Sequence, residues 1–287
     1  MAARGGRGAE MGDRVRYETL DEGSIALVTM TRERYRNALS QQMMAEIVDA
    51  FAEAEGDDAV RVIILRGDGP VFSAGHDLGS PDAMEMRAAN EGESMGRRFP
   101  RTRGMDVDPH LHIRGIPKPT ISMVQGSCIY AAWMLASATD VIFAAEGTQF
   151  LATNFAYFSV PWDLGARRAL HLLYDNRFLT AEEAMRFGFV ADVFPADRLE
   201  AETLAYARRV AQNDPFQMRM LKHSVHQMQE MQGFTAHILS SYSDRMVRAA
   251  NTEAHITEDQ GEGKRRLYKS VERARANREG GGSEGAN

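Results

Sequence analysis

The 287-residue sequence contains a single cysteine, Cys128, and only two tryptophans. One cysteine excludes an intrachain disulfide framework and a cysteine-rich metal site, and it fits a reducing compartment, so we expect a cytoplasmic protein. The chain also lacks an excess of positive charge, because 34 Lys and Arg stand against 40 Asp and Glu, with a net charge of −6. We therefore expect no broad basic face and no nucleic-acid partner.

The sequence also lacks an apolar segment of the kind that a signal peptide or a membrane span needs. Residues 1–13 carry arginines and glycines instead, and we interpret them as a disordered leader. The uncharged run at 119–139 is long enough to span a bilayer, but Ser122, Gln125 and Gly126 make it too polar. Burial inside a protein core, as a strand and then a helix, explains it better, and we expect no membrane partner.

What the sequence does contain is a repeated order of strand, turn and helix. Apolar runs predict buried strands at residues 24–30, 60–66, 120–124 and 140–145. The spacing of Met44, Ile47 and Phe51 predicts an amphipathic helix between the first two strands. This order is typical of an α/β fold with parallel strands and right-handed crossovers.

Other segments carry weaker signals. Residues 81–114 have many charged and few aliphatic side chains, and we expect one helix followed by a partly irregular stretch. Residues 196–276 are expected to be helical, with a break at 213–215. Residues 277–287 contain no core-forming side chains, and we interpret them as a disordered tail.

Residues 72–78, Phe-Ser-Ala-Gly-His-Asp-Leu, follow a predicted strand and precede a predicted helix. Backbone N–H groups in such a loop lack partners and lie at the positive end of the helix dipole, so the loop can bind an anion or a polarised carbonyl. Gly75 allows the backbone to approach a ligand closely. A structural turn capped by Asp77 would explain the same residues.

A second turn begins at Gly126 and leads into a helix that we expect to continue through Thr139. Its small residues at 131, 132 and 136 would let the helix approach a ligand or another backbone closely. Loops of either kind are common when they occur alone. Their joint occurrence is therefore more informative than either one.

Together the two turns resemble the crotonase superfamily, the enoyl-CoA hydratase and isomerase group. Similar residues occur at 37–39, before the two turns, and at 182–184 and 257–263, after them. The resemblance covers residues 16–273 and implies a crotonase-like ββα superhelix at 14–195, followed by a C-terminal helical oligomerisation region at 196–276. It also implies a homotrimer or a homohexamer.

The resemblance further implies that the substrate is an acyl-CoA thioester, so that no separate cofactor and no metal ion are expected. In this family two backbone N–H groups hold the thioester oxygen, and by alignment they belong to His76 and Ala131. Fixed donors at this place would stabilise the charge that develops on the oxygen when an enolate forms, each by about 3 kcal/mol. The side chain of His76 has no required role in this scheme.

The same alignment suggests contacts with coenzyme A. Arg34 matches a basic residue near the nucleotide, and Lys264 could reach the phosphates from the last helix. Ala74, Asp77 and Leu78 belong to the loop that would border the ligand. For either of the two basic residues taken singly, a solvated surface charge is the simpler interpretation.

The sequence departs from the family at the catalytic acids. Hydratases of this family use two glutamates, and Met134 and Asn154 occupy those places, so ordinary hydration is not expected. Asp163 lies within one position of a catalytic aspartate in some isomerases and dehalogenases of the family, and aromatic neighbours would raise its pKa and suit it to act as a base. Alternatively it caps a helix that begins near Gly165 or pairs with Arg167.

If the alignment holds, five side chains line the acyl pocket: Met84, Trp133, Met134, Asn154 and Trp162. The large rings suggest an apolar acyl group, and core packing would explain them as well. We therefore expect an enoyl-CoA hydratase or isomerase. The alternatives are an isomerase or thioester hydrolase that uses Asp163, and a paralogue that binds acyl-CoA without turnover.

Overall fold

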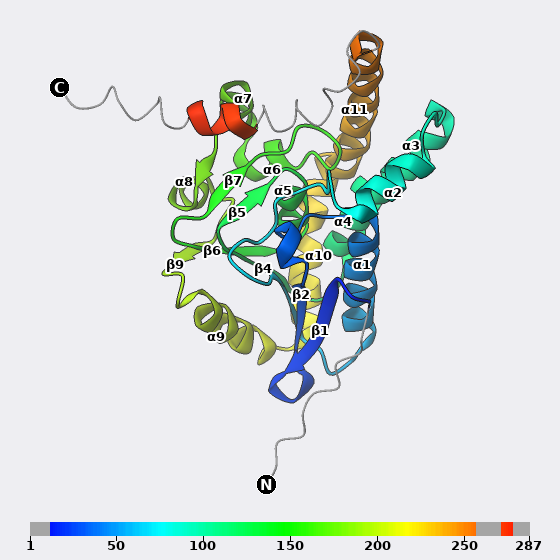
Figure 1. Ribbon diagram of the computed structural model, residues 1–287. Coiled ribbons are helices and arrows are strands. Elements are labelled where there is room, and N and C mark those ends of the chain that lie inside the picture. Colours follow the sequence, from blue (N-terminus) through cyan, green and yellow to red (C-terminus); the bar gives the residue numbers. More distant parts are fainter. Residues whose placement is uncertain (1–11, 257–270, 278–287) are drawn as a thin grey trace, which may run out of the picture.

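The computed structural model describes residues 12–256 and 271–277 (Figure 1). Its main sheet has six strands in the order β1-β2-β3-β4-β6-β9, and a second sheet has the order β5-β7-β8. The main sheet consists of β1 (Val15–Leu20), β2 (Ile25–Met30), β3 (Val62–Gly67), β4 (Thr120–Val124), β6 (Val141–Ala145) and β9 (Asp192–Phe194). The second sheet consists of β5 (Ser127–Ile129), β7 (Gln149–Leu151) and β8 (Leu179–Thr180).

The strand directions confirm the predicted α/β class. In the main sheet every neighbouring pair is parallel except β1 and β2. In the second sheet β5 and β7 are parallel, and β7 and β8 are antiparallel. Parallel neighbours need long crossover connections, and these connections carry the helices and the second sheet. The four strands predicted from apolar runs all form.

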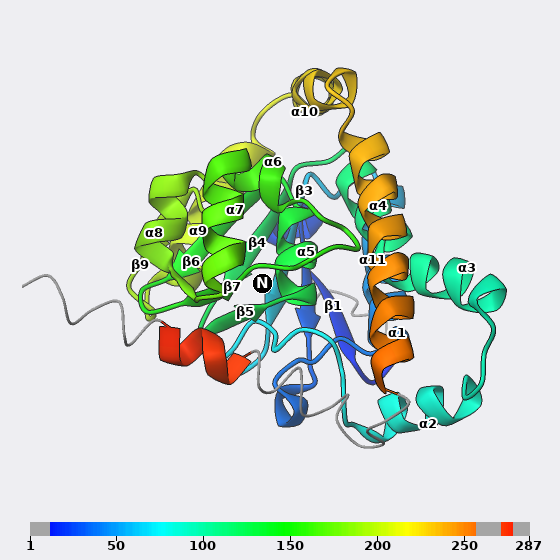
Figure 2. The ribbon, with the colours of Figure 1, turned by 90° about the horizontal axis from the view of Figure 1, so that it is seen from above.

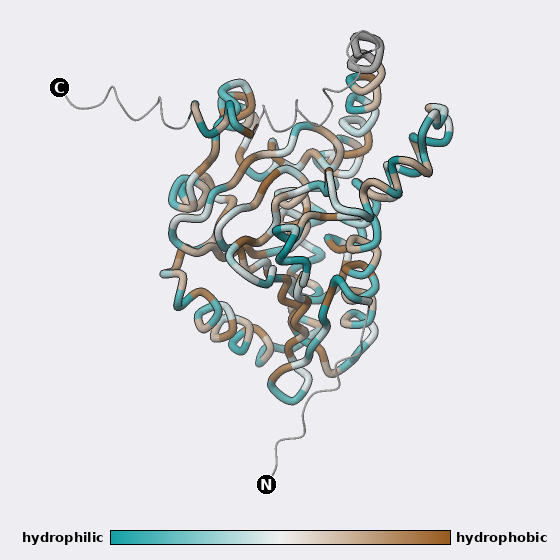
Figure 3. Tube along the Cα trace, in the orientation of Figure 1, coloured by the Kyte–Doolittle hydropathy of each residue, from teal (hydrophilic) through white to brown (hydrophobic). Residues whose placement is uncertain are grey.

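Alternate residues of the main sheet point to opposite faces, and helices cover both. Ile25, Leu27 and Ile64 share one buried cluster with α9 (Leu199–Ala211). Val28 and Leu65 belong to the cluster on the other side, with α1 (Gln41–Gly56) and α5 (Ala131–Ser137). Figure 3 shows the apolar residues concentrated on the central strands, which are therefore buried on both faces.

Residues 81–115 form three helices, where the sequence led us to expect one helix and an irregular stretch. They are α2 (Pro81–Ala89), α3 (Met95–Asp106) and α4 (Asp108–Gly115), and α2 and α3 project from the body in both ribbon views (Figures 1 and 2). Helix α3 is stabilised by contacts that its own sequence does not reveal. The Tyr242 hydroxyl donates to the Phe99 carbonyl at 2.5 Å, and the two rings meet edge to face.

The remaining helices include the predicted C-terminal ones. They are α6 (Val160–Leu164), α7 (Ala166–Asp175), α8 (Ala181–Phe187), α10 (Pro215–Met231) and α11 (Phe234–Ile256). The break at 213–215 is confirmed, because Asp214 caps α10 by accepting a hydrogen bond from the Gln217 N–H. Within residues 12–256 and 271–277, no helix combines the length and the apolarity that a bilayer crossing requires.

The two turns singled out in the sequence meet in space. Ser73 and Cys128 form an isolated parallel bridge, so residues 73–76 run beside the end of β5. Gly75 has a φ of 84°, and a Cβ atom at this position would lie 2.2 Å from the Ile129 carbonyl oxygen and 3.5 Å from the Ala131 nitrogen. Glycine is required here by both the conformation and the close approach of the backbones.

This contact leads to a prediction for Gly75→Ala, with Gly147→Ala as the matched control. Gly147 also has a positive φ, 76°, but nothing lies within 4 Å of its missing Cβ. We expect the control to lower the free energy of unfolding by about 1 kcal/mol, the cost of the conformation alone. Gly75→Ala should lower it by roughly 1–3 kcal/mol more, because the methyl group displaces the Ile129 carbonyl. Urea unfolding measures both values, and equal losses would contradict the tight contact.

Candidate active site

The N–H groups of His76 and Ala131 lie at this junction. Leu39 donates its N–H to the Gly75 carbonyl at 2.8 Å and accepts the Asp77 N–H at 3.1 Å. Because successive amides of an extended chain point to opposite sides, the His76 N–H points away from Leu39. Ala131 begins α5, so its N–H has no acceptor within the helix. In the described part of the chain, neither of these two amides donates a hydrogen bond.

Side chains that the sequence analysis did not assign to the site hold the loop in place. Asn37 is fully buried, and its amide nitrogen donates to the carbonyls of Asp68 and Val71 at 2.9 and 3.0 Å. The Ser73 hydroxyl donates to the Asn37 carbonyl at 2.7 Å and accepts the Gly75 N–H at 3.1 Å. These bonds fix the direction of the loop before any ligand binds.

Tyr130 gives the second turn an unusual conformation. Its φ of 49° and ψ of −100° are sparsely populated for a residue with a side chain. Its N–H donates to the Leu151 carbonyl at 2.9 Å, which ties the turn to β7. This conformation carries the chain from β5 directly into α5, with Ala131 at the junction. The sequence gives no sign of it, because only the surrounding structure maintains it.

Asp77 is engaged in the structure of its own loop. The carboxylate pairs with Arg32 at 2.8 Å and accepts the N–H groups of Gly79 and Ser80 at 3.2 and 3.0 Å. Burial alone would raise the pKa of Asp77, but hydrogen bonds from Ser80, Arg32 and Gly79 outweigh it and lower the pKa. The turn capped by Asp77, one of the two interpretations of the sequence, is therefore present.

The other predicted coenzyme A contacts are dispersed. Arg34 is exposed, with its guanidinium 5.7 Å from the centre of the Tyr35 ring. Ala74 and Leu78 are half-buried in the loop. Lys264 lies outside the described residues, as does the predicted family match at 257–263. These contacts therefore remain predictions.

The positions of the two absent glutamates differ in their surroundings. Met134 lies on α5, three residues after Ala131, and is fully buried. Asn154 is exposed in the loop after β7. Neither side chain is a carboxylate, so a water molecule cannot be activated there by a pair of acids as it is in the family's hydratases.

Asp163 is half-buried and accepts hydrogen bonds from three neighbouring side chains. It accepts the Trp133 indole N–H at 2.8 Å, the Ser159 hydroxyl at 2.8 Å and the Ser137 hydroxyl at 3.0 Å. Burial raises the pKa of Asp163 to about 6, although these three hydrogen bonds oppose the shift. The direction of this shift is the one expected from the sequence.

The two structural alternatives for Asp163 were wrong. Helix α7 begins after Gly165 without a side-chain cap, and Asp163 forms no ion pair with Arg167 within the described ranges. Asp163 instead joins α6 to α5, through side chains that come from deep in the fold. Ser137 is the last residue of α5, about 9 Å along the helix axis from Ala131.

The five predicted pocket residues differ in burial and in the side chains that they contact. Trp133 is fully buried and stacks on Phe189 with 3.9 Å between ring centres, so it is a core residue beside the buried Met134. Met84 is 53% exposed on α2, and Asn154 is exposed. Trp162 packs against the Phe234 ring with 5.2 Å between centres. Met134 lies one turn from Ala131 on α5. That these five residues line one acyl pocket stays a prediction.

Comparison with known proteins agrees with the fold. Residues 21–261 match the family described as Enoyl-CoA hydratase/isomerase. EchA13 of Mycobacterium tuberculosis, whose name assigns it to the enoyl-CoA hydratases, is 38% identical over 245 residues, which are 77% of this chain and 76% of that protein. The mitochondrial enoyl-CoA hydratase domain-containing protein 3 of Danio rerio is 32% identical over 203 residues, 68% of this chain and 67% of that protein.

A solved structure shows the same architecture. A Mycobacterium thermoresistibile protein, described as one of the enoyl-CoA hydratases, superposes with a TM-score of 0.76 at 33% identity, covering 84% of this chain and 98% of its own. The crotonase-like fold with its C-terminal helices is thereby confirmed. The family match spans both turns and the substituted acid positions. The chain belongs to the enoyl-CoA hydratase/isomerase family of enzymes.

Proposed function

We propose that this protein forms or stabilises the enolate of an acyl-CoA thioester, with the N–H groups of His76 and Ala131 as the oxyanion hole. The observation that carries the proposal is that these two N–H groups lie close together beside Gly75 and that neither donates a hydrogen bond within the described residues. A base removes a proton from the carbon next to the thioester. The electron pair of that C–H bond forms a C=C bond to the carbonyl carbon, and the π pair of the carbonyl moves onto the thioester oxygen. Fixed N–H donors stabilise this developing charge more strongly than the ground state.

The presence of Met134 and Asn154 at the places of the two glutamates favours isomerase-like chemistry over hydration. Water addition needs one group to activate water and another to deliver a proton, and Met134 and Asn154 supply neither. The buried side chains around α5 are mostly apolar, so the acyl chain is expected to be mostly apolar as well. We propose no separate cofactor, because coenzyme A is part of the substrate.

Solvent deuterium exchange tests the enolate step without knowledge of the natural substrate. In deuterium oxide, butanoyl-CoA should gain deuterium at the carbon next to the thioester, while crotonyl-CoA should add water slowly or not at all. Mass spectrometry of the recovered thioester measures both. Hydration at the rate of an efficient enzyme would contradict our account of Met134 and Asn154, and binding without exchange would indicate a protein that only binds acyl-CoA.

Asp163 is the base in the competing proposal, which the raised pKa favours and its three hydrogen bonds disfavour. If it is the base, Asp163→Asn should abolish exchange while acyl-CoA binding survives. If it only joins α6 to α5, exchange should persist in the folded variant. Circular dichroism and acyl-CoA binding measured on the same sample distinguish loss of the base from loss of the fold.

The stability of the wild type relative to Asp163→Asn should change with pH in a defined direction. The folded-state pKa of about 6 lies above the ordinary aspartate value, so between pH 4 and 6 the folded protein holds a proton that the unfolded chain has released. The free energy of unfolding of the wild type should therefore fall relative to that of the variant as the pH rises through this window, by about 2–3 kcal/mol. Urea unfolding at a series of pH values measures the difference between the two proteins. A difference that stays constant with pH would contradict the raised pKa of Asp163.

Assembly into a homotrimer or homohexamer is also proposed, and α10 is the feature that supports it. No residue of α10 is buried, and Figure 2 shows the helix at the outer edge of the molecule. Its inward contacts are polar, since Lys222 pairs with Asp140 at 2.8 Å and Gln229 accepts a hydrogen bond from Arg114 at 2.7 Å. Its exposed apolar side chains are Phe216, Met220, Leu221, Val225, Met228 and Met231.

A helix that turns polar groups inward and apolar groups outward is expected to be covered by another protein surface. The double variant Val225→Glu/Met228→Glu should therefore sediment as a smaller species than the wild type. Both side chains are more than half exposed, 58% and 52%, so the protomer itself should stay folded. Leu170→Glu, at a position of 48% exposure on α7, is the control. Equal masses for the wild type and the double variant would contradict an interface on α10.

A further inference from the structure

His110 and Tyr157 place polar atoms in the core without partners. His110, on α4, is 1% exposed, and Tyr157, after β7, is fully buried. Their rings stack with 5.2 Å between centres and 27° between planes. Across the described residues, no hydrogen-bond partner exists for either imidazole nitrogen or for the Tyr157 hydroxyl. Leaving such groups unpaired is costly, so this arrangement is expected to have a function.

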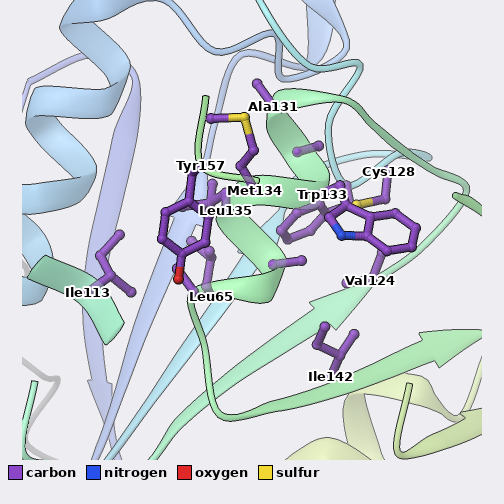
Figure 4. Packing of buried hydrophobic residues seen from close by; sticks show 14 of the residues in the cluster. Leu65, Ile113, Val124, Cys128, Ala131, Trp133, Met134, Leu135, Ile142 and Tyr157 are labelled. Carbon is purple, nitrogen blue, oxygen red and sulfur yellow. The ribbon is translucent and has the colours of Figure 1, made fainter. Parts of the chain in front are cut away.

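Tyr157 lies beside α5, the helix that begins with the proposed oxyanion donor Ala131. In Figure 4, Tyr157 stands between Ile113 of α4 and Met134 of α5, and all three belong to one buried cluster. Met134 follows the proposed oxyanion donor Ala131 by one helical turn. On the other side, Asp106 carries its Oδ1 3.9 Å from the His76 Nδ1, and its other oxygen accepts a hydrogen bond from Arg245.

Both rings are neutral at physiological pH. Burial lowers the pKa of His110 to about 4, and the negative charge of Asp106 opposes this shift. Burial likewise raises the pKa of Tyr157 far above its usual value. A neutral imidazole offers one N–H donor and one nitrogen acceptor, and the phenol offers one donor and one acceptor.

This combination suits a neutral oxygen and does not suit a carboxylate. A hydroxyl or keto group can donate to or accept from either ring, whereas a buried carboxylate would need a cation. The nearby cations are already engaged, because Arg245 pairs with Asp106 and Arg114 donates to Gln229 and lies over the Phe234 ring. The buried cluster that contains Tyr157 is otherwise formed by apolar side chains.

We propose that His110 and Tyr157 form a specificity site that hydrogen-bonds a hydroxyl or keto oxygen on the acyl chain of the thioester. This inference rests on the proposed function and names its substrate class, an oxygenated acyl-CoA in place of a plain aliphatic one. It also explains why two polar rings are kept in a core where apolar residues would pack without unpaired atoms. The proposal involves no proton transfer by either ring.

The test compares the binding of hexanoyl-CoA with that of its 3-hydroxy, 3-oxo and 5-hydroxy derivatives by calorimetry. The wild type should bind at least one oxygenated thioester about tenfold more tightly than hexanoyl-CoA, the effect of a hydrogen bond made in a desolvated site. Tyr157→Phe removes only the hydroxyl and should reduce the preference several-fold. Combining it with His110→Leu should abolish the preference without weakening the binding of hexanoyl-CoA.

Tyr17→Phe is the matched control, because the Tyr17 hydroxyl is also buried without a partner among the described residues but belongs to β1. It should keep the full preference. The two test variants should unfold at the same or higher urea concentration than the wild type, since each removes unpaired polar atoms from the core. This readout does not depend on ligand binding.

The outcomes separate the two proposals. If the wild type binds the thioesters but prefers none of the oxygenated ones, or if Tyr157→Phe and the double variant retain the preference, the specificity site is refuted and the oxyanion proposal stands. If the wild type binds none of the four thioesters, the proposed function fails and the specificity site fails with it.

Discussion

The close contact between Gly75 and the main chain at Ile129 and Ala131 is the constraint on which the candidate site depends. A Cβ atom at residue 75 would come within 2.2 Å of a carbonyl oxygen, so the two turns meet only because the residue is glycine. Leu39 forms hydrogen bonds with the Gly75 carbonyl and the Asp77 N–H, and the His76 N–H points away from Leu39. In the proposed function, backbone geometry set by the fold provides the two donors before any ligand binds.

Both carboxylates discussed for the site, Asp77 and Asp163, make structural contacts. Asp77 closes the first turn with Arg32, and Asp163 ties α6 to α5 through Trp133. In the alignment used for the proposed function, Met134 replaces a catalytic glutamate, so the proposed chemistry relies on neutral main-chain donors. The neutral rings of the further inference follow the same principle. Such a site favours charge that develops during the reaction over charge that the substrate brings.

Much of the fold could be predicted from the sequence, because apolar runs such as residues 120–124 mark buried strands and the two turns carry small residues at ordered positions. The tasks of individual polar side chains could not. Asp163 is buried by the packing of α6 on α5, and α3 is held by Tyr242 from a helix far along the chain. The pairing of His110 with Tyr157 could not be predicted either, because tertiary structure alone brings the two rings together.

The most direct test of the central claim is a crystal structure with a bound, non-hydrolysable acyl-CoA analogue. The account predicts that the carbonyl oxygen of the analogue accepts hydrogen bonds from the N–H groups of both His76 and Ala131, with N···O distances of about 2.7–3.2 Å. An acyl oxygen bound to side chains elsewhere, or in contact with only one of the two amides, would contradict it.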